Sequence, residues 1–223
     1  MFNPKKDTED LKKFLINDDI NFSWKQSSLI FTEDSKDIQK KVKFLPGIYF
    51  DNLKILQNVR KKSKSLLSKK YSSPRRLWLG LFYENELKSI FNKYRYVLRK
   101  KNEKIGFGIF SLQNILEETF LGQYSGIVKK RKRFLIKNND YLLRYSVENI
   151  EDKEYVIDAK EYGNFSRFIN HSQNPNVEIR TIVLDNIIYK TLFSIKKIKE
   201  KDELLIDYGS LYWKQIKLQP ETL

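Results

Sequence analysis

The chain of 223 residues contains no cysteine and a single histidine. The lack of cysteine excludes disulfide bonds, thiolate zinc sites and a cysteine nucleophile, and it fits a reducing compartment. With one histidine, no histidine-based metal site is expected. No apolar run approaches the roughly 20 residues of a membrane span. The opening stretch MFNPKKDTED also lacks the apolar core of a secretory signal peptide.

Positive charge is what the chain has in excess. Lys and Arg number 43 against 28 Asp and Glu, which gives a net charge of +15. A field of that size attracts polyanions such as nucleic acids, although a coding bias toward lysine explains the excess equally well. Hydrophobic residues make up 40% of the chain, which is typical of a globular protein with a real core.

Two segments concentrate this charge. Residues 60–76 carry eight basic side chains and no acidic one, and VKKRKRFL (128–135) holds five consecutive basic residues. The second run resembles a nuclear localisation signal or a DNA-contact patch, and a solvated basic loop is the alternative. Its members are Lys129, Lys130, Arg131, Lys132 and Arg133.

The hydrophobic pattern changes near residue 94. Residues 1–94 favour helices, among them one long amphipathic helix over 72–94 whose residues Leu77, Leu81, Leu87 and Phe91 are expected to face the core. Residues 95–209 contain short β-rich runs separated by polar and Asn/Gly breaks, and 210–223 form a closing segment with aromatic side chains. The fold expected is mainly β with α, built from short antiparallel strands and a helical N-terminal region.

Four motifs of the second half occur in a recognisable order. They are KIGFGIFS (104–111), GQYSGIV (122–128), RFINHSQNPN (167–176) and ELLIDYG (203–209). Together they resemble the SET-domain protein lysine methyltransferases, over about residues 95 to 213. The resemblance implies the SET-domain fold, with a knot-like threading of its C-terminal part. A compact, lysine-rich SET protein with a helical N-terminus is also similar to the chlamydial SET proteins.

The resemblance implies a reaction. A SET enzyme transfers the methyl group of S-adenosyl-L-methionine to a lysine ε-amine by in-line displacement. Since the unperturbed lysine has a pKa of about 10.4, burial near the positive sulfonium must first favour its neutral form. The expected substrate is a histone or a bacterial histone-like protein. A basic nucleic-acid-binding or chromatin-binding protein with an inactive SET-like core is the alternative.

The resemblance also assigns residues. Tyr124 and Tyr208 are the expected catalytic side chains, which line the lysine channel and the position of the transferring methyl. The cofactor-binding residues expected from the motifs are Gly106, Phe107, Gly108, Tyr141, Arg167, Asn170, His171, Tyr208 and Trp213. For Tyr141 and Trp213, ordinary packing is the competing interpretation.

Two departures from the family pattern carry expectations of their own. Gln173 stands where relatives usually have a zinc-binding cysteine, so the C-terminal closure is expected to be free of zinc. Ile206 stands where many relatives have Phe or Tyr, which predicts di- or trimethylation.

The expected location is the bacterial cytoplasm and nucleoid, or a host nucleus if the protein is a secreted effector. No membrane partner is expected, and a homodimer stays open.

Overall fold

The computed structural model describes residues 11–17, 20–67, 74–103, 105–137, 139–146, 154–209 and 212. Its helical elements are the 3-10 helices η1 (Trp24–Gln26), η2 (Glu33–Ser35) and η3 (Phe165–Phe168) and the α-helices α2 (Lys36–Lys41), α3 (Leu53–Leu67), α4 (Pro74–Phe82), α5 (Glu84–Lys88) and α6 (Arg133–Lys137). Its strands are β1 (Leu29–Phe31), β2 (Lys43–Phe44), β3 (Ile48–Phe50), β4 (Tyr96–Asn102), β5 (Gly106–Ser111), β6 (Phe120–Gln123), β7 (Gly126–Lys130), β8 (Leu142–Arg144), β9 (Tyr155–Asp158), β10 (Tyr162–Gly163), β11 (Asn170–His171), β12 (Val177–Leu184), β13 (Ile187–Ser194) and β14 (Leu205–Ile206).

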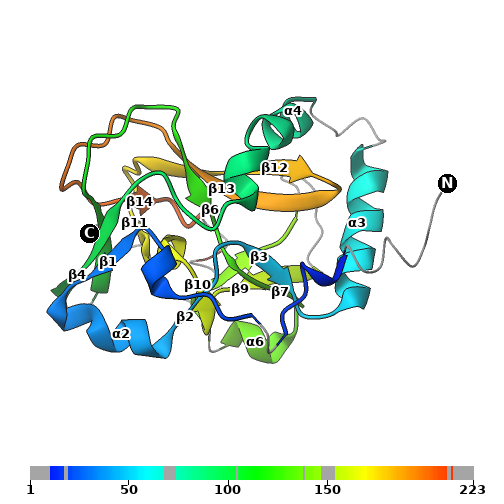
Figure 1. Cartoon of the computed structure of the whole chain (residues 1–223), viewed down its shortest axis with the longest axis horizontal. Coiled ribbons are helices and arrows are strands. Elements are labelled where there is room, and N and C mark those ends of the chain that lie inside the picture. The colour runs from blue at the N-terminus through cyan, green and yellow to red at the C-terminus, as the bar shows by residue number, and fades with distance from the viewer. Residues whose placement is uncertain are drawn as a thin grey trace.

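The strands form several small sheets (Figure 1). The order is β3-β7-β9-β8 in one, β12-β13-β6 in a second and β1-β4-β5 in a third, and β10–β2 and β11–β14 are separate pairs. The β-rich runs expected after residue 94 are therefore confirmed. The longest hairpin, β12–β13, turns through Asp185 and Asn186, whose φ angles of 52° and 60° are those of a type I′ turn.

The N-terminal region contributes strands as well as helices. β1 pairs with β4, β2 with β10 and β3 with β7, and all three pairings are parallel, as is β11 with β14. These four parallel pairs stand beside the antiparallel pairs that the sequence predicted. Strands of two or three residues are too short to show an alternating pattern, which explains why the sequence predicted only helices in this region.

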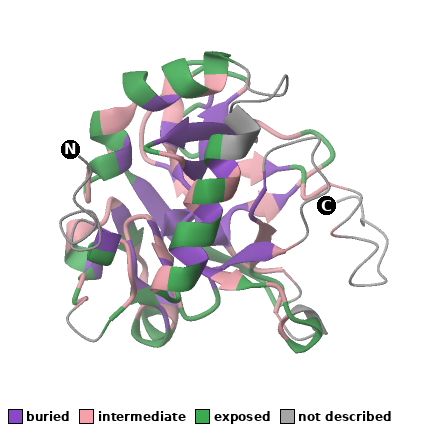
Figure 2. Ribbon diagram, turned by 90° about the vertical axis from the view of Figure 1, so that its right-hand side faces the viewer, coloured by how far each residue is buried: buried purple, intermediate pink, exposed green. Residues whose placement is uncertain are grey.

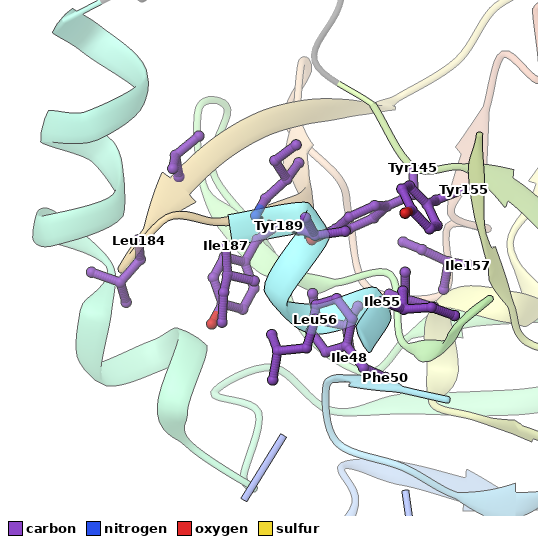
Figure 3. Packing of buried hydrophobic residues seen from close by; sticks show 14 of the residues in the cluster. Ile48, Phe50, Ile55, Leu56, Tyr145, Tyr155, Ile157, Leu184, Ile187 and Tyr189 are labelled. Atoms are coloured by element: carbon purple, nitrogen blue, oxygen red, sulfur yellow. Dashed lines mark hydrogen bonds between the residues drawn. The ribbon is translucent and has the colours of Figure 1, made fainter. Parts of the chain in front are cut away.

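Helix α3 connects this N-terminal region to the core. The Asn52 side chain accepts a hydrogen bond from the Ile55 N–H at 3.0 Å and so caps the helix. Ile55, Leu56 and Val59 are buried on one side of the helix. They pack with residues of β3 and the β12–β13 hairpin, as Figure 3 shows for Leu56, Ile48 and Ile187 among others.

The long helix expected over residues 72–94 is broken. α4 and α5 are separated at Tyr83, and only Leu87 of the four predicted core residues is buried. Leu77, Leu81 and Phe91 are exposed, so the prediction for them is wrong. Gly80 is the buried residue of α4, and a Cβ at this position would lie 2.0 Å from the Val183 carbonyl oxygen. The glycine thus lets α4 lie close to β12 (Figure 1).

Figure 2 shows that buried residues lie mainly on the strands inside the fold. Their side chains form two hydrophobic clusters. One gathers α3, β3, β7, β9 and the β12–β13 hairpin, and the other gathers β1, β2, β4, β5, η3 and β14. Both contain residues from before and after position 94, so the two regions share their cores. No helix among the described residues is long and apolar enough to cross a membrane.

Candidate active site

The segments 170–176 and 203–209 lie against one another. β11 and β14 pair in parallel with Asn170 opposite Leu205 and His171 opposite Ile206. The Ser172 N–H continues the ladder by donating to the Ile206 carbonyl at 3.0 Å. The Asn176 side chain donates from Nδ2 to the Glu203 carbonyl at 2.7 Å and accepts the Leu205 N–H at 2.9 Å. Two motifs separated by about 30 residues are thereby fixed in register.

Glu203 connects this pair to the Gly-x-Gly strand β5. Asn170 Nδ2 donates to the Phe107 carbonyl at 3.0 Å and to Glu203 Oε1 at 2.9 Å. Lys101 Nζ lies 2.7 Å from Glu203 Oε2. The donor end of the Asn170 amide is therefore used within the protein, which leaves the acceptor end as the part suited to a ligand. Sequence reasoning missed Glu203, although it is the first residue of ELLIDYG.

The two glycines of β5 differ in what surrounds them. A Cβ on Gly108 would lie 2.4 Å from Glu203 Oε1, so this glycine makes room for a carboxylate of the protein rather than for a ligand. Gly106 has a φ of +78°, a conformation that favours glycine, and a Cβ there would meet nothing within 4 Å. The open side of Gly106 fits a ligand that lies against the backbone.

His171 orients the Asp-Tyr-Gly segment. The buried imidazole accepts the Tyr208 N–H at Nδ1, over 3.1 Å. An Nδ1 that accepts this hydrogen bond carries no proton, which assigns the proton of the neutral ring to Nε2. The Asp207 carboxylate lies 3.6 Å from the same Nδ1. His171 therefore holds Tyr208 by a hydrogen bond to its backbone N–H as well as by contact between the two rings.

The two expected catalytic tyrosines have the same hydrogen-bonding arrangement. The Tyr208 hydroxyl donates to the Ile169 carbonyl at 2.8 Å, and the Tyr124 hydroxyl donates to the Tyr141 carbonyl at 3.2 Å. Each phenol has one hydrogen to donate, so each oxygen is directed to act as an acceptor. Burial raises the pKa of both hydroxyls above the ordinary value of 10.0, and the proximity of Tyr124 adds to the rise at Tyr208. Both phenols are therefore neutral at physiological pH.

Arg167 braces the segment around Tyr141. Its buried guanidinium donates from Nε to the Ala159 carbonyl at 2.7 Å and from Nη2 to the Lys160 carbonyl at 3.3 Å. The guanidinium carbon also lies 3.9 Å from the centre of the Tyr141 ring, a cation–π contact. Arg167 therefore contacts Tyr141, whose backbone carbonyl accepts the hydrogen bond from the Tyr124 hydroxyl.

Of the expected closing segment, only Tyr212 is described. Its ring meets the Tyr208 ring edge-to-face with the centroids 4.6 Å apart. Trp213 lies outside the described residues. Across the described ranges, no group of three or more His, Cys, Asp or Glu side chains could hold a metal ion.

The structure therefore brings together the expected residues of β5, of 167–171 and of 203–209, with Tyr124 and Tyr141 beside them. The arrangement offers two neutral phenol acceptors, one amide and an open backbone edge at Gly106. Such a set of groups can orient an amine. The roles of the individual residues stay predictions.

Comparison with known proteins finds similarity over this region. Residues 106–209 match the family model of the SET domain. The chain is 32% identical over 127 residues to histone-lysine N-methyltransferase SUV39H2 of Gallus gallus, and this alignment covers 52% of the chain and 30% of that protein. It is 31% identical over 134 residues to histone-lysine N-methyltransferase EHMT1 of Homo sapiens, covering 58% of the chain and 10% of that protein.

Solved structures are similar to the chain over a comparable region. One is the crystal structure of KRYPTONITE in complex with mCHH DNA, an H3(1-15) peptide and SAH, with a TM-score of 0.45 and 26% identity over 52% of this chain and 24% of that chain. The chain spans less than a third of the length of the relatives named here.

Proposed function

We propose that the protein is a protein-lysine N-methyltransferase, because residues 106–209 match the SET-domain family model and the chain is similar to histone-lysine N-methyltransferases. It transfers methyl from S-adenosyl-L-methionine to a lysine of a histone or histone-like protein. The observation that carries the proposal is the pair of buried phenols, Tyr124 and Tyr208, whose hydroxyl hydrogens are both donated to backbone carbonyls.

The residues that would hold S-adenosyl-L-methionine are those around the open edge of β5. The backbone at Gly106 and Phe107 is approachable, and the Asn170 amide and the backbone of His171 complete this side. When bound, the cofactor supplies a methyl group on a positively charged sulfur. Arg167 acts here by positioning, because its guanidinium is held by Ala159, Lys160 and the Tyr141 ring.

The protein's own contribution is to orient the amine. A neutral lysine amine donates its N–H groups to the oxygens of Tyr124 and Tyr208, which directs its lone pair away from both phenols. Burial in an apolar channel, beside the positive charge that the cofactor would bring, would disfavour the charged ammonium and so lower the pKa of the incoming lysine. Neither phenol serves as a base, because burial raises the pKa of both. Alignment of the amine therefore accounts for a large share of the acceleration.

The experiment is methyl transfer from labelled cofactor to core histones and to a purified bacterial nucleoid protein. The wild type is expected to label at least one of them, and the double variant Tyr124→Phe/Tyr208→Phe is expected to label neither while it still binds cofactor. Absence of labelling by a wild-type protein that binds the cofactor would favour the alternative, a nucleic-acid-binding protein with an inactive core.

One observation supports nucleic-acid contact in either case. Lys130, Lys132 and Arg133 at the end of β7 and the start of α6 are exposed. Lys129 differs, because its ammonium lies 2.9 Å from Asp158 in a half-buried ion pair. The proposed basic patch therefore consists of the three exposed residues and Arg131. A bacterial origin of the kind the chlamydial resemblance implies, and the location that goes with it, are proposed on the sequence alone.

A further inference from the structure

A cavity of about 380 Å³ lies apart from the site described above. It opens between the segment 83–94, the segment 116–123 and the loop before η3, and none of Tyr124, Asn170, His171 and Tyr208 lines it. The segment 83–94 precedes the SET domain, so this cavity is formed jointly by the SET domain and by the region before it.

The walls of the cavity are aromatic and aliphatic. Tyr83 and Phe120 stack with their ring centroids 4.7 Å apart. At the rim, Phe91 is 69% exposed and Leu116 is 72% exposed. The apolar surface continues onto α4, where Phe82 meets the Tyr83 ring edge-to-face. Large apolar side chains left in water in this number and proximity are typical of a binding surface.

The lining of the cavity does not share the strong positive charge of the whole protein. Its ionisable groups include two carboxylates, Glu86 and Glu118, against one ammonium, Lys93, whereas the chain as a whole carries +15. Glu118 forms a bidentate ion pair with Arg180. Glu86 is exposed and has no ion-pair partner among the described residues. A basic ligand repelled by much of the surface therefore meets a favourable charge here.

The floor carries a polar group that is not satisfied. Gln123 is 5% exposed, and its Nε2 donates to the Leu87 carbonyl at 3.0 Å. Its buried Oε1 has no hydrogen-bond partner among the described residues. A buried acceptor without a donor is costly, which favours an occupant that brings an N–H or O–H group.

We propose that this cavity is a docking site for the protein substrate, and that it takes a basic segment with one bulky apolar side chain, at a distance along the substrate from the lysine that is methylated. The apolar side chain enters between Tyr83, Phe91 and Leu116, and a neighbouring lysine or arginine meets Glu86. The inference rests on the proposed function for the identity of the occupant. The cavity itself does not depend on it.

The position of the cavity relative to the catalytic site supports this assignment. Gln123 ends β6, and the next residue is Tyr124. Successive side chains of an extended chain point to opposite sides, so Gln123 faces the cavity and Tyr124 faces the tyrosine cluster. A substrate held at the cavity is therefore kept close to the site where its lysine reacts, which raises the effective concentration of that lysine.

A binding experiment tests the cavity without catalysis. The probe is a fluorescein-labelled peptide of twelve residues, rich in lysine and arginine with one central phenylalanine, measured by anisotropy. The wild type is expected to bind it, and binding is expected to weaken at least tenfold in Phe91→Ser/Leu116→Ser and in Glu86→Lys. Because these side chains are exposed, the fold should be retained, which circular dichroism checks. Matched controls are Phe134→Ser and Glu33→Lys, which alter equally exposed residues elsewhere and should bind as the wild type does.

Three outcomes would overturn the proposal: equal binding of a probe in which serine replaces phenylalanine, tighter binding of an acidic probe, and loss of wild-type self-association in the same variants. The last would make the cavity an interface between two copies of the chain.

Kinetics on core histones and on a short histone-tail peptide then separate the two proposals. The cavity variants are expected to raise KM for the whole histone at least fivefold, with kcat unchanged and with activity on the short peptide unchanged. If the wild type binds the probe at the cavity but methylates no substrate, the docking site stands and the proposed activity fails. If both substrates are methylated equally well by the cavity variants, the docking site fails and the activity stands.

Discussion

Replacing Tyr208 by phenylalanine removes one oxygen atom and keeps the ring. The change has two effects of different size. The Ile169 carbonyl loses its 2.8 Å donor, which costs about 1 kcal/mol of stability. The incoming amine loses an acceptor placed before the reaction begins, and such groups are worth about 10²–10³ in rate, or about 2.7–4 kcal/mol.

The loss of stability is too small to account for the expected loss of rate. A protein with an unfolding free energy of 5 to 15 kcal/mol stays almost wholly folded after losing about 1 kcal/mol. A hundredfold fall in rate therefore has to come from the transition state. The assay is single-turnover methyl transfer, with cofactor affinity measured by calorimetry on the same preparations. Affinity is expected to change little. Tyr212→Phe, which alters the ring in contact with Tyr208, is the control and is expected to keep activity.

The pH profile adds an independent check. Burial raises the pKa of Tyr208 and Tyr124 above 10, so both are protonated throughout the range below pH 10. The rate should therefore rise with pH only as the target lysine loses its proton, and Tyr208→Phe should lower the whole curve without changing its shape. Transfer by the variant at the wild-type rate would refute the catalytic role of Tyr208 and with it the assigned mechanism.

Three further predictions concern the cofactor, the product and the basic patch. Asn170→Ala should weaken cofactor binding by on the order of 1–3 kcal/mol, because it leaves polar partners unpaired; unchanged affinity by calorimetry in a folded variant would contradict the assigned pocket. Ile206 offers no hydroxyl to hold a water beside the amine, so di- or trimethyl-lysine is expected, and mass spectrometry that finds only monomethyl product after exhaustive reaction would overturn this. Changing Lys130, Lys132 and Arg133 to glutamate should impair binding to DNA-loaded substrate more than to free peptide, by a factor that shrinks with added salt; an equal loss on both at every salt concentration would mean that the patch is structural.

The second half of the chain was easier to interpret from its sequence than the N-terminal region. The four motifs are contiguous stretches, and the resemblance that they carry implied one shared site; the contact of Asn170 with the Phe107 carbonyl agrees with that placement. Helix α3 was also predictable, because its apolar positions repeat with the helical period over several turns. In contrast, the packing of the Tyr141 ring on Arg167 depends on a cation–π contact that no local sequence pattern predicts.

Other features depend on partners distant in the sequence. Gly80 looks like a tolerated glycine inside a helix, and only the structure shows that this residue lies against Val183 while Leu81 is 66% exposed. Glu203 looks like a solvated charge at the start of a strand, and its role becomes visible only when Gly108 and Asn170 lie beside it. The surroundings of Gly80 and of Glu203 both depend on tertiary contacts, which a single sequence does not show.

The parallel strands contributed by the N-terminal region have a consequence for any shortened form of the protein. β1 covers one edge of β4, and β3 covers one edge of β7. A fragment that begins at residue 95 would expose the N–H and C=O groups of both edges, together with the apolar surface that Phe50 and Leu56 cover. Uncovered edges of this kind recruit strands from other molecules. The family match at 106–209 therefore delimits a region of similar sequence, and a stable fragment has to include the strands before it.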